Sequence, residues 1–170
     1  ACCSVKIERQ IGNMMNHKRI NLNADLGESF GAWQMGNDPA LLQMVKSANV
    51  ACGFHAGDPL VMQNTVRLCL AENVSIGAHP SFHDIEGFGR REMNLPAAEI
   101  YDLVIYQVSA MQGIVKVNGG KLHHVKPHGA LYNMSAKNYS LAAAIANFRV
   151  ALGHAVLFVI VPDLLDHLRA

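Results

Sequence analysis

Val74-Ser-Ile-Gly-Ala-His79 is a short apolar run that ends in an ionisable side chain, and the same pattern occurs elsewhere in the chain. Residues 20–25, 48–55 and 122–128 are built in the same way, and segments with helical patterning separate the four runs. Strands that alternate with helices favour a parallel sheet, in which all strand ends face one side. We therefore expect one shared pocket, formed by Asp25, His55, His79 and His128.

The composition is that of an ordinary globular domain. Of the 170 residues, 51% are hydrophobic and 16% are charged, and the net charge is +1. The sequence contains no basic stripe of the kind that would predict nucleic-acid binding. It also contains no apolar run long enough to span a membrane. The four cysteines lack zinc-site spacing, so we expect a reducing, cytoplasmic setting. We expect residues 1–15 to be a disordered extension and residues 16–170 to be one domain.

The order of expected elements predicts an α/β fold of about five βα units. Expected strands cover 20–24, 48–52, 74–78, 122–126 and 156–161. Two expected helices begin at Asp38-Pro39 and Asp58-Pro59, where the Asp is the cap. Two more cover 96–117 and 140–150, and a last one begins near 163. These elements fit either a doubly wound sheet or a β/α barrel. A full barrel takes about 250 residues, so the barrel interpretation requires an incomplete one.

Carboxylates and imidazoles at strand ends are candidates for acid–base chemistry or metal binding. Asp25 could act as a base or a metal ligand, although a loop hydrogen bond is its simpler role. Glu28 lies in the same loop. Glycines flank His55 and allow close approach of a ligand. A proline follows His79 and stops its strand. A single such histidine is often only a satisfied polar residue, but matching strand ends favour a function.

The segment His123-His-Val-Lys-Pro-His128 is the densest cluster. Alternation along a strand places His124 and Lys126 on one face. Lys126 could stabilise an anion or pair with Asp25. In the long loop 80–95, Arg90 could bind a carboxylate or phosphate, although loop arginines are usually solvated. The chain has no Walker A motif and no G-x-S-x-G elbow.

Five motifs together resemble the LamB/YcsF family, from about residue 20 to 134. They are Asn21-Leu-Asn-Ala-Asp-Leu-Gly-Glu-Ser-Phe-Gly31, Ser47-Ala-Asn-Val-Ala-Cys-Gly-Phe-His-Ala-Gly-Asp58, Ile76-Gly-Ala-His-Pro80, Gly87-Phe-Gly-Arg90 and His123-His-Val-Lys-Pro-His-Gly-Ala-Leu-Tyr-Asn133. Motifs of this length in this order make the resemblance specific.

The resemblance implies a β/α barrel of the glycoside hydrolase/deacetylase type, truncated here at its C-terminus. It also implies ATP-dependent opening of the lactam of 5-oxo-L-proline (pyroglutamate) to L-glutamate, as the A subunit of a 5-oxoprolinase that works with subunits B and C. ATP is then a co-substrate of the complex. The family's matching polar positions are Asp25, Glu28, His55, His79, Lys126 and His128.

We predict two sets of site residues on this basis. The catalytic set is Asp25, His55, His79, Lys126 and His128, and the substrate-binding set is Glu28, Arg90 and His124. Three alternatives stay open. The chain could be a metal-dependent deacetylase or hydrolase with Asp25, His55 and His79 as ligands, a non-catalytic partner subunit, or an inactive fragment. A homo-oligomer is also open.

Overall fold

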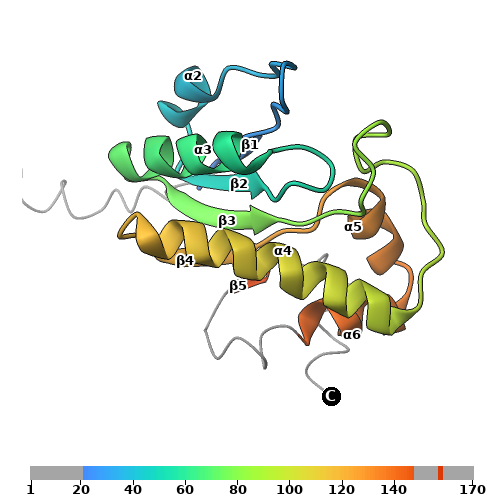
Figure 1. Cartoon of the computed structure of the whole chain (residues 1–170). Coiled ribbons are helices and arrows are strands. Elements are labelled where there is room, and N and C mark those ends of the chain that lie inside the picture. The colour runs from blue at the N-terminus through green and yellow to red at the C-terminus, as the bar shows by residue number, and fades with distance from the viewer. Residues whose placement is uncertain (1–20, 148–156, 159–170) are drawn as a thin grey trace, which may run out of the picture.

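The computed structural model describes residues 21–147 and 157–158 (Figure 1). The strands are β1 (Asn23–Leu26), β2 (Ser47–Ala51), β3 (Ser75–His79), β4 (Leu122–Val125) and β5 (Leu157–Phe158). The helices are α2 (Asp38–Leu42), α3 (Pro59–Ala71), α4 (Ala97–Val117), α5 (Gly129–Ser135) and α6 (Tyr139–Ala146).

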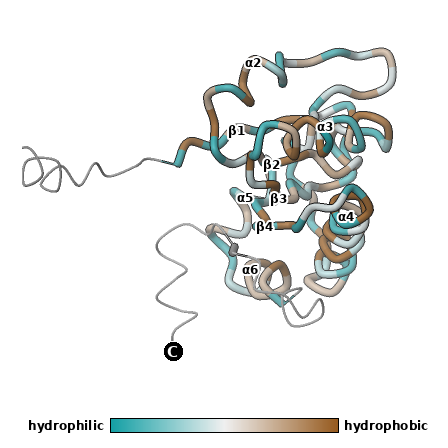
Figure 2. The backbone as a smooth tube through the Cα atoms, turned by 90° about the vertical axis from the view of Figure 1, so that its left-hand side faces the viewer, coloured by the Kyte–Doolittle hydropathy of each residue, from teal (hydrophilic) through white to brown (hydrophobic). Residues whose placement is uncertain are grey.

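The predicted parallel sheet is confirmed. Its strands lie in the order β1-β2-β3-β4-β5, and each pairs with its neighbour in parallel. A doubly wound sheet has a point at which the strand order reverses, and it carries helices on both faces. Here the order is sequential, and α3 and α4 lie on the same side of the strands (Figure 2). The arrangement is therefore that of a barrel-like (β/α) fold and not the doubly wound alternative.

The two faces of the sheet differ in chemistry because side chains alternate along each strand. Val50 of β2 and Ile76 of β3 belong to the apolar core, together with Val66 of α3 and Val104 of α4. Asn49 lies between the core positions of β2, and its side chain contacts Asp25, Asn23 and His124 instead. The face away from α3 and α4 is therefore polar.

The start of α3 follows the predicted pattern. The Asp58 side chain accepts hydrogen bonds from the backbone N–H groups of Leu60 and Val61, and Pro59 occupies the first turn. The predicted cap of α2 is wrong, because Asn37 and not Asp38 caps that helix. The Asp38 carboxylate accepts a hydrogen bond from the backbone N–H of Gly27 at 2.8 Å, which ties α2 to the end of β1.

Several elements also differ from expectation. Strand β1 continues to Leu26, so Asp25 lies inside the strand and not after it. Helix α5 was not predicted, and it begins directly after His128. Helix α6 starts at Tyr139, one residue early. The expected extension 1–15, the expected helix near 163 and most of the expected strand 156–161 lie outside the described residues. In the described part of the chain, no helix has both the length and the apolar character to span a bilayer.

Candidate active site

The structure brings the ionisable strand ends together at the C-terminal edge of the sheet. Asp25 lies on β1, His79 ends β3, and His55 lies between β2 and α3. Lys126 and His128 follow β4, and Glu28 follows β1. The expected pocket of Asp25, His55, His79 and His128 is thus a contiguous cluster, which the distances below establish.

Asp25 is the centre of a hydrogen-bonded group. Its Oδ1 accepts hydrogen bonds from Lys126 Nζ at 2.7 Å and from Asn49 Nδ2 at 2.8 Å. Its Oδ2 lies 3.4 Å from His79 Nε2. Burial acts to raise the pKa of Asp25, but the hydrogen bonds and charges of His79 and Lys126 outweigh it and hold the pKa well below its ordinary value. Asp25 is therefore ionised at neutral pH.

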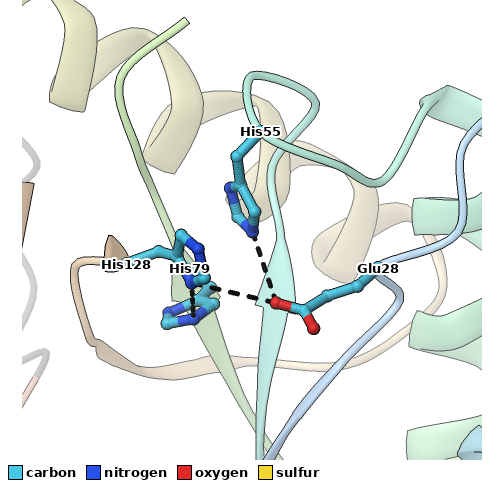
Figure 3. Close-up of side chains that lie close together, drawn as sticks. All are labelled: Glu28, His55, His79 and His128. Atoms are coloured by element: carbon cyan, nitrogen blue, oxygen red, sulfur yellow. Dashed lines mark hydrogen bonds and ion pairs between the residues drawn. The ribbon is translucent and has the colours of Figure 1, made fainter. Parts of the chain in front are cut away.

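A second group joins Glu28 to three histidines (Figure 3). Glu28 Oε1 lies 3.4 Å from His55 Nε2 and 3.8 Å from His128 Nδ1, and His128 Nδ1 lies 3.0 Å from His79 Nε2. The His55 and His128 rings stack with centroids 3.9 Å apart. One ligand atom from each of the four side chains lies within 4.8 Å of the others, so together they can hold a metal ion.

Burial keeps two of these imidazoles neutral. Burial, together with the neighbouring His55 and His79, lowers the pKa of His128 to about 4. Burial also lowers the pKa of His55, against the opposing effect of the Glu28 carboxylate. Both rings therefore present a free lone pair at neutral pH.

The loop that contains Gly87-Phe-Gly-Arg90 covers the histidines. The backbone carbonyl of Phe88 accepts a hydrogen bond from His128 Nε2 at 2.9 Å. The Phe88 ring makes an edge-to-face contact with the His55 ring. Phe88 has φ +53°, a conformation that is costly for a non-glycine residue. A Cβ on Gly89 would overlap Ser81 Oγ and lie 2.9 Å from His55 Cβ and 3.0 Å from His128 Cδ2, so only glycine lets the loop approach this closely.

An ion pair inside the loop holds it in this shape. Arg91 Nε donates to Asp84 Oδ1 at 2.8 Å, and the backbone N–H of Gly87 donates to the same oxygen at 3.0 Å. The Asp84 side chain is fully buried. The hydrogen bond from Arg91 holds the pKa of Asp84 below its ordinary value. Arg91 is thus a structural residue of the loop.

The predicted substrate-binding residues lie in three different places. Glu28 is in the histidine group. Arg90 is exposed at the rim, with its guanidinium 5.3 Å from the centroid of the Phe88 ring. His124 is buried on the polar face of the sheet, where Nε2 lies 2.7 Å from Asn49 Oδ1. A Cβ on Gly77 would overlap the His124 ring, so this glycine makes room for it.

A pocket of about 240 Å³ opens beside the histidine group. Its polar lining residues are Glu28, His55 and Glu86. Its remaining wall is mostly apolar and includes Phe30, Trp33, Met35, Ile85 and Phe88. Small-molecule sites combine apolar walls with few polar groups in this way.

Sequence reasoning missed Asn49, Phe88 and Asp84. Asn49 carried a detectable signal, because it is a polar residue between the buried apolar residues of a strand and alternates with them. Phe88 acts through its backbone carbonyl, which no side-chain pattern reveals. Asp84 reaches Arg91 through the fold of an irregular loop, for which spacing gives no rule.

Comparison with known proteins identifies the family of this chain. The LamB/YcsF family matches residues 20–164. The 5-oxoprolinase A subunit of Bacillus cereus (strain AH187) is 65% identical over 127 residues, which cover 75% of this chain and 50% of that protein. The protein of the same name from Azoarcus sp. (strain BH72) is 63% identical over 127 residues, with the same coverage. This chain therefore spans about half the length of these relatives.

A solved structure gives the same result at the level of the fold. The crystal structure of the lactam utilization protein from Thermus thermophilus superposes with a TM-score of 0.83 at 46% identity. The match covers 85% of this chain and 58% of that one. Since the family match extends over most of the 170 residues, the chain belongs to the LamB/YcsF family.

Proposed function

We propose that this chain is part of an ATP-dependent 5-oxoprolinase that opens the lactam of 5-oxo-L-proline to L-glutamate. The observation that carries the proposal is the Asp25–Lys126 pair, joined at 2.7 Å beside three histidines at the edge of a parallel sheet. Relatives that are 62–65% identical are named as the A subunit of 5-oxoprolinase, which supports the same reaction. The name also supports partner subunits, which we propose to be B and C.

The chemistry requires ATP because a five-membered lactam is a stabilised amide. Transfer of the γ-phosphoryl group of ATP to the lactam oxygen releases ADP and makes the ring carbon electrophilic. Water then adds to that carbon, the C–N bond breaks, and phosphate leaves with the lactam oxygen. The products are the amine and carboxylate of glutamate. ATP is thus a co-substrate of the complex in this proposal.

The two charged side chains of the pair have complementary tasks in this scheme. Asp25 is ionised, so it can accept a proton from the attacking water. Lys126 is half-buried and can stabilise negative charge that develops on the substrate oxygen. The apolar pocket beside Glu28 has the size and character to receive the ring methylenes. We also propose that the five strands are part of a closed barrel of the glycoside hydrolase/deacetylase type.

The test is turnover by the chain combined with subunits B and C. With 5-oxo-L-proline and ATP, glutamate, ADP and phosphate should form in equal amounts. L-Proline has the same ring and carboxylate but no lactam carbonyl, so it should yield no ADP above background. Failure of 5-oxo-L-proline to stimulate ATP hydrolysis or glutamate formation would contradict the proposal.

A metal-dependent hydrolase that needs no ATP is the second candidate. The observation in its favour is the group of Glu28, His55, His79 and His128, whose ligand atoms lie within 4.8 Å of one another. The same assay separates the two candidates, because this second enzyme would open an amide without consuming ATP. The cytoplasmic setting inferred from the cysteines stays a prediction.

A further inference from the structure

Two histidines of the group have their outer ring nitrogens hydrogen-bonded to backbone carbonyls. His79 Nδ1 lies 2.6 Å from the backbone carbonyl of Lys126, and His128 Nε2 lies 2.9 Å from that of Phe88. A carbonyl oxygen can only accept, so each of these outer nitrogens carries the ring proton. A neutral imidazole has one N–H. With one proton on each ring, the inner nitrogens, His79 Nε2 and His128 Nδ1, both present lone pairs. A second proton on His79 would instead point from Nε2 toward Asp25 Oδ2, 3.4 Å away, or toward His128 Nδ1.

These two nitrogens lie 3.0 Å apart, with the rings inclined at 82°. Glu28 Oε1 adds a third acceptor, 3.8 Å from His128 Nδ1, and this buried oxygen has no hydrogen-bond partner. Three converging acceptors repel one another unless a positive group lies between them. Buried polar atoms without a partner are rare in folded proteins, and such an atom in a native structure often marks an ion or a ligand.

We propose that Glu28, His79 and His128 bind a divalent transition-metal ion, with His55 as the fourth ligand (Figure 3). In a tetrahedral zinc site with bonds of about 2.0–2.1 Å, neighbouring ligand atoms are roughly 3.3 Å apart. Three of the six separations are 3.0, 3.4 and 3.8 Å, close to that value, and all six lie within 4.8 Å. Imidazole nitrogens suit zinc and its neighbours, whereas magnesium and calcium prefer oxygen ligands.

The hydrogen bonds around the group support a metal site independently of the distances. Metal-binding histidines almost always donate their other N–H to a carbonyl or carboxylate, which fixes the tautomer and the ring orientation. His79 and His128 both do so, each to a backbone carbonyl. The strained backbone of Phe88 is what holds one of these carbonyls in place.

His55 must turn to complete the site. Its ring is parallel to that of His128, with an interplanar angle of 6°, so the two lone pairs do not yet meet at one point. Neither of its nitrogens has a hydrogen-bond partner, although the side chain is buried. Rotation about the Cβ–Cγ bond therefore breaks no hydrogen bond. His55 Nε2 starts 3.4 Å from Glu28 Oε1, which is already close to the expected ion.

This ligand set differs from the Asp25, His55 and His79 set that the sequence suggested. Asp25 Oδ1 is hydrogen-bonded to Lys126 and Asn49, and its Oδ2 lies beside His79 alone. Glu28 is the carboxylate whose oxygen lies within 4.8 Å of a nitrogen of all three histidines. The inference also stands apart from the proposed reaction. Metal binding is measured without turnover, so either proposal can fail while the other survives.

The experiment measures zinc bound to the purified chain. The protein is saturated with zinc and dialysed against metal-free buffer, and the metal is quantified by mass spectrometry. The wild type should retain about one zinc per chain, as one four-ligand site requires. Cobalt in place of zinc should give the intense visible absorption of a tetrahedral site. Glu28→Gln and His79→Asn should weaken zinc binding by at least about 10-fold, the smallest loss seen even for outer-shell changes.

The matched control is His83→Asn, which removes an exposed imidazole away from the group and should leave zinc binding unchanged. A folded wild-type chain that retains no zinc would overturn the proposal and would indicate a proton shared between His79 and His128. Equal zinc retention by the wild type, Glu28→Gln and His79→Asn would also overturn it. If a variant fails to fold, the wild-type stoichiometry and the cobalt spectrum decide the question alone.

Discussion

The two sides of the active site differ in how completely their polar atoms are paired. On the Asp25 side, the carboxylate has both Lys126 and Asn49 as donors. On the Glu28 side, Oε1 of the carboxylate and both nitrogens of His55 are buried without a hydrogen-bond partner. Each such atom costs about 1–3 kcal/mol of stability. The Asp25 side is therefore built before a ligand arrives, whereas the Glu28 side is complete only with one.

The largest effect should come from the paired side. Asp25→Asn removes the negative charge that holds Lys126 and the group that we propose as proton acceptor. Turnover of 5-oxo-L-proline by the chain with subunits B and C should fall by at least about 100-fold. The exposed Asp102→Asn on α4 makes the same chemical change away from the site and should leave the rate unchanged. A near-normal rate for Asp25→Asn would remove Asp25 from the catalytic set.

The covering loop offers a test of how tightly the Glu28 side is enclosed. Gly89→Ala places a Cβ against Ser81 Oγ, His55 and His128 at a residue with φ +66°. The free energy of unfolding should fall by about 1–3 kcal/mol, since both overpacking and left-handed backbone are penalised. Urea denaturation measures this change. Gly113→Ala on α4 meets no atom within 4 Å and should raise stability by up to about 1 kcal/mol. Equal effects of the two variants would show that the loop does not press on the histidines.

The sheet and the main helices were predictable because their signals are local. Asp58-Pro59 starts α3 through hydrogen bonds to residues two and three positions along the chain. At α2 the same pattern misled, because Asn37 and Asp38 are both good caps. The choice between them depends on Gly27, which is 11 residues away and occupies the Asp38 carboxylate. Helix α5 is only 7 residues long and begins with glycine, so its own sequence carries little helical signal.

The residues of the site could be predicted from the sequence better than their arrangement in space. Strand ends brought the right side chains to one edge, since that follows from parallel topology alone. The division into two sides did not follow, because it depends on where β1 ends. The strand continues to Leu26, so Asp25 points from the strand toward Lys126 and Asn49. Glu28, beyond the strand end, is then the carboxylate that faces the histidines.

A smaller effect should arise from the ion pair that shapes the loop. Asp84→Asn removes the carboxylate that binds Arg91. Because the pKa of Asp84 is lowered in the folded chain, its contribution is complete above the unfolded pKa of about 4 and is lost as pH falls through the folded pKa. The difference in unfolding midpoint between wild type and variant should therefore shrink on acidification. Glu86→Gln changes an exposed partner of Arg91 and should alter stability little at any pH. A difference that is constant with pH would show that the Asp84 charge is not involved.

The smallest effect is expected at the rim, where Arg90 touches neither side of the site directly. Its exposed guanidinium lies over the Phe88 ring. An ion pair between an exposed arginine and an anionic group is worth about 0.2–1 kcal/mol, a factor of roughly 1.4–5 in binding. Arg90→Ala should therefore raise KM for 5-oxo-L-proline by about that factor and leave kcat unchanged, if the arginine only guides an anionic substrate inward. Arg67→Ala, an exposed arginine on α3, is the matched control and should change neither constant. A fall in kcat as large as that of Asp25→Asn would mean that Arg90 moves from the rim to the reacting atoms during turnover, and the loop would then belong to the chemistry and not only to its cover.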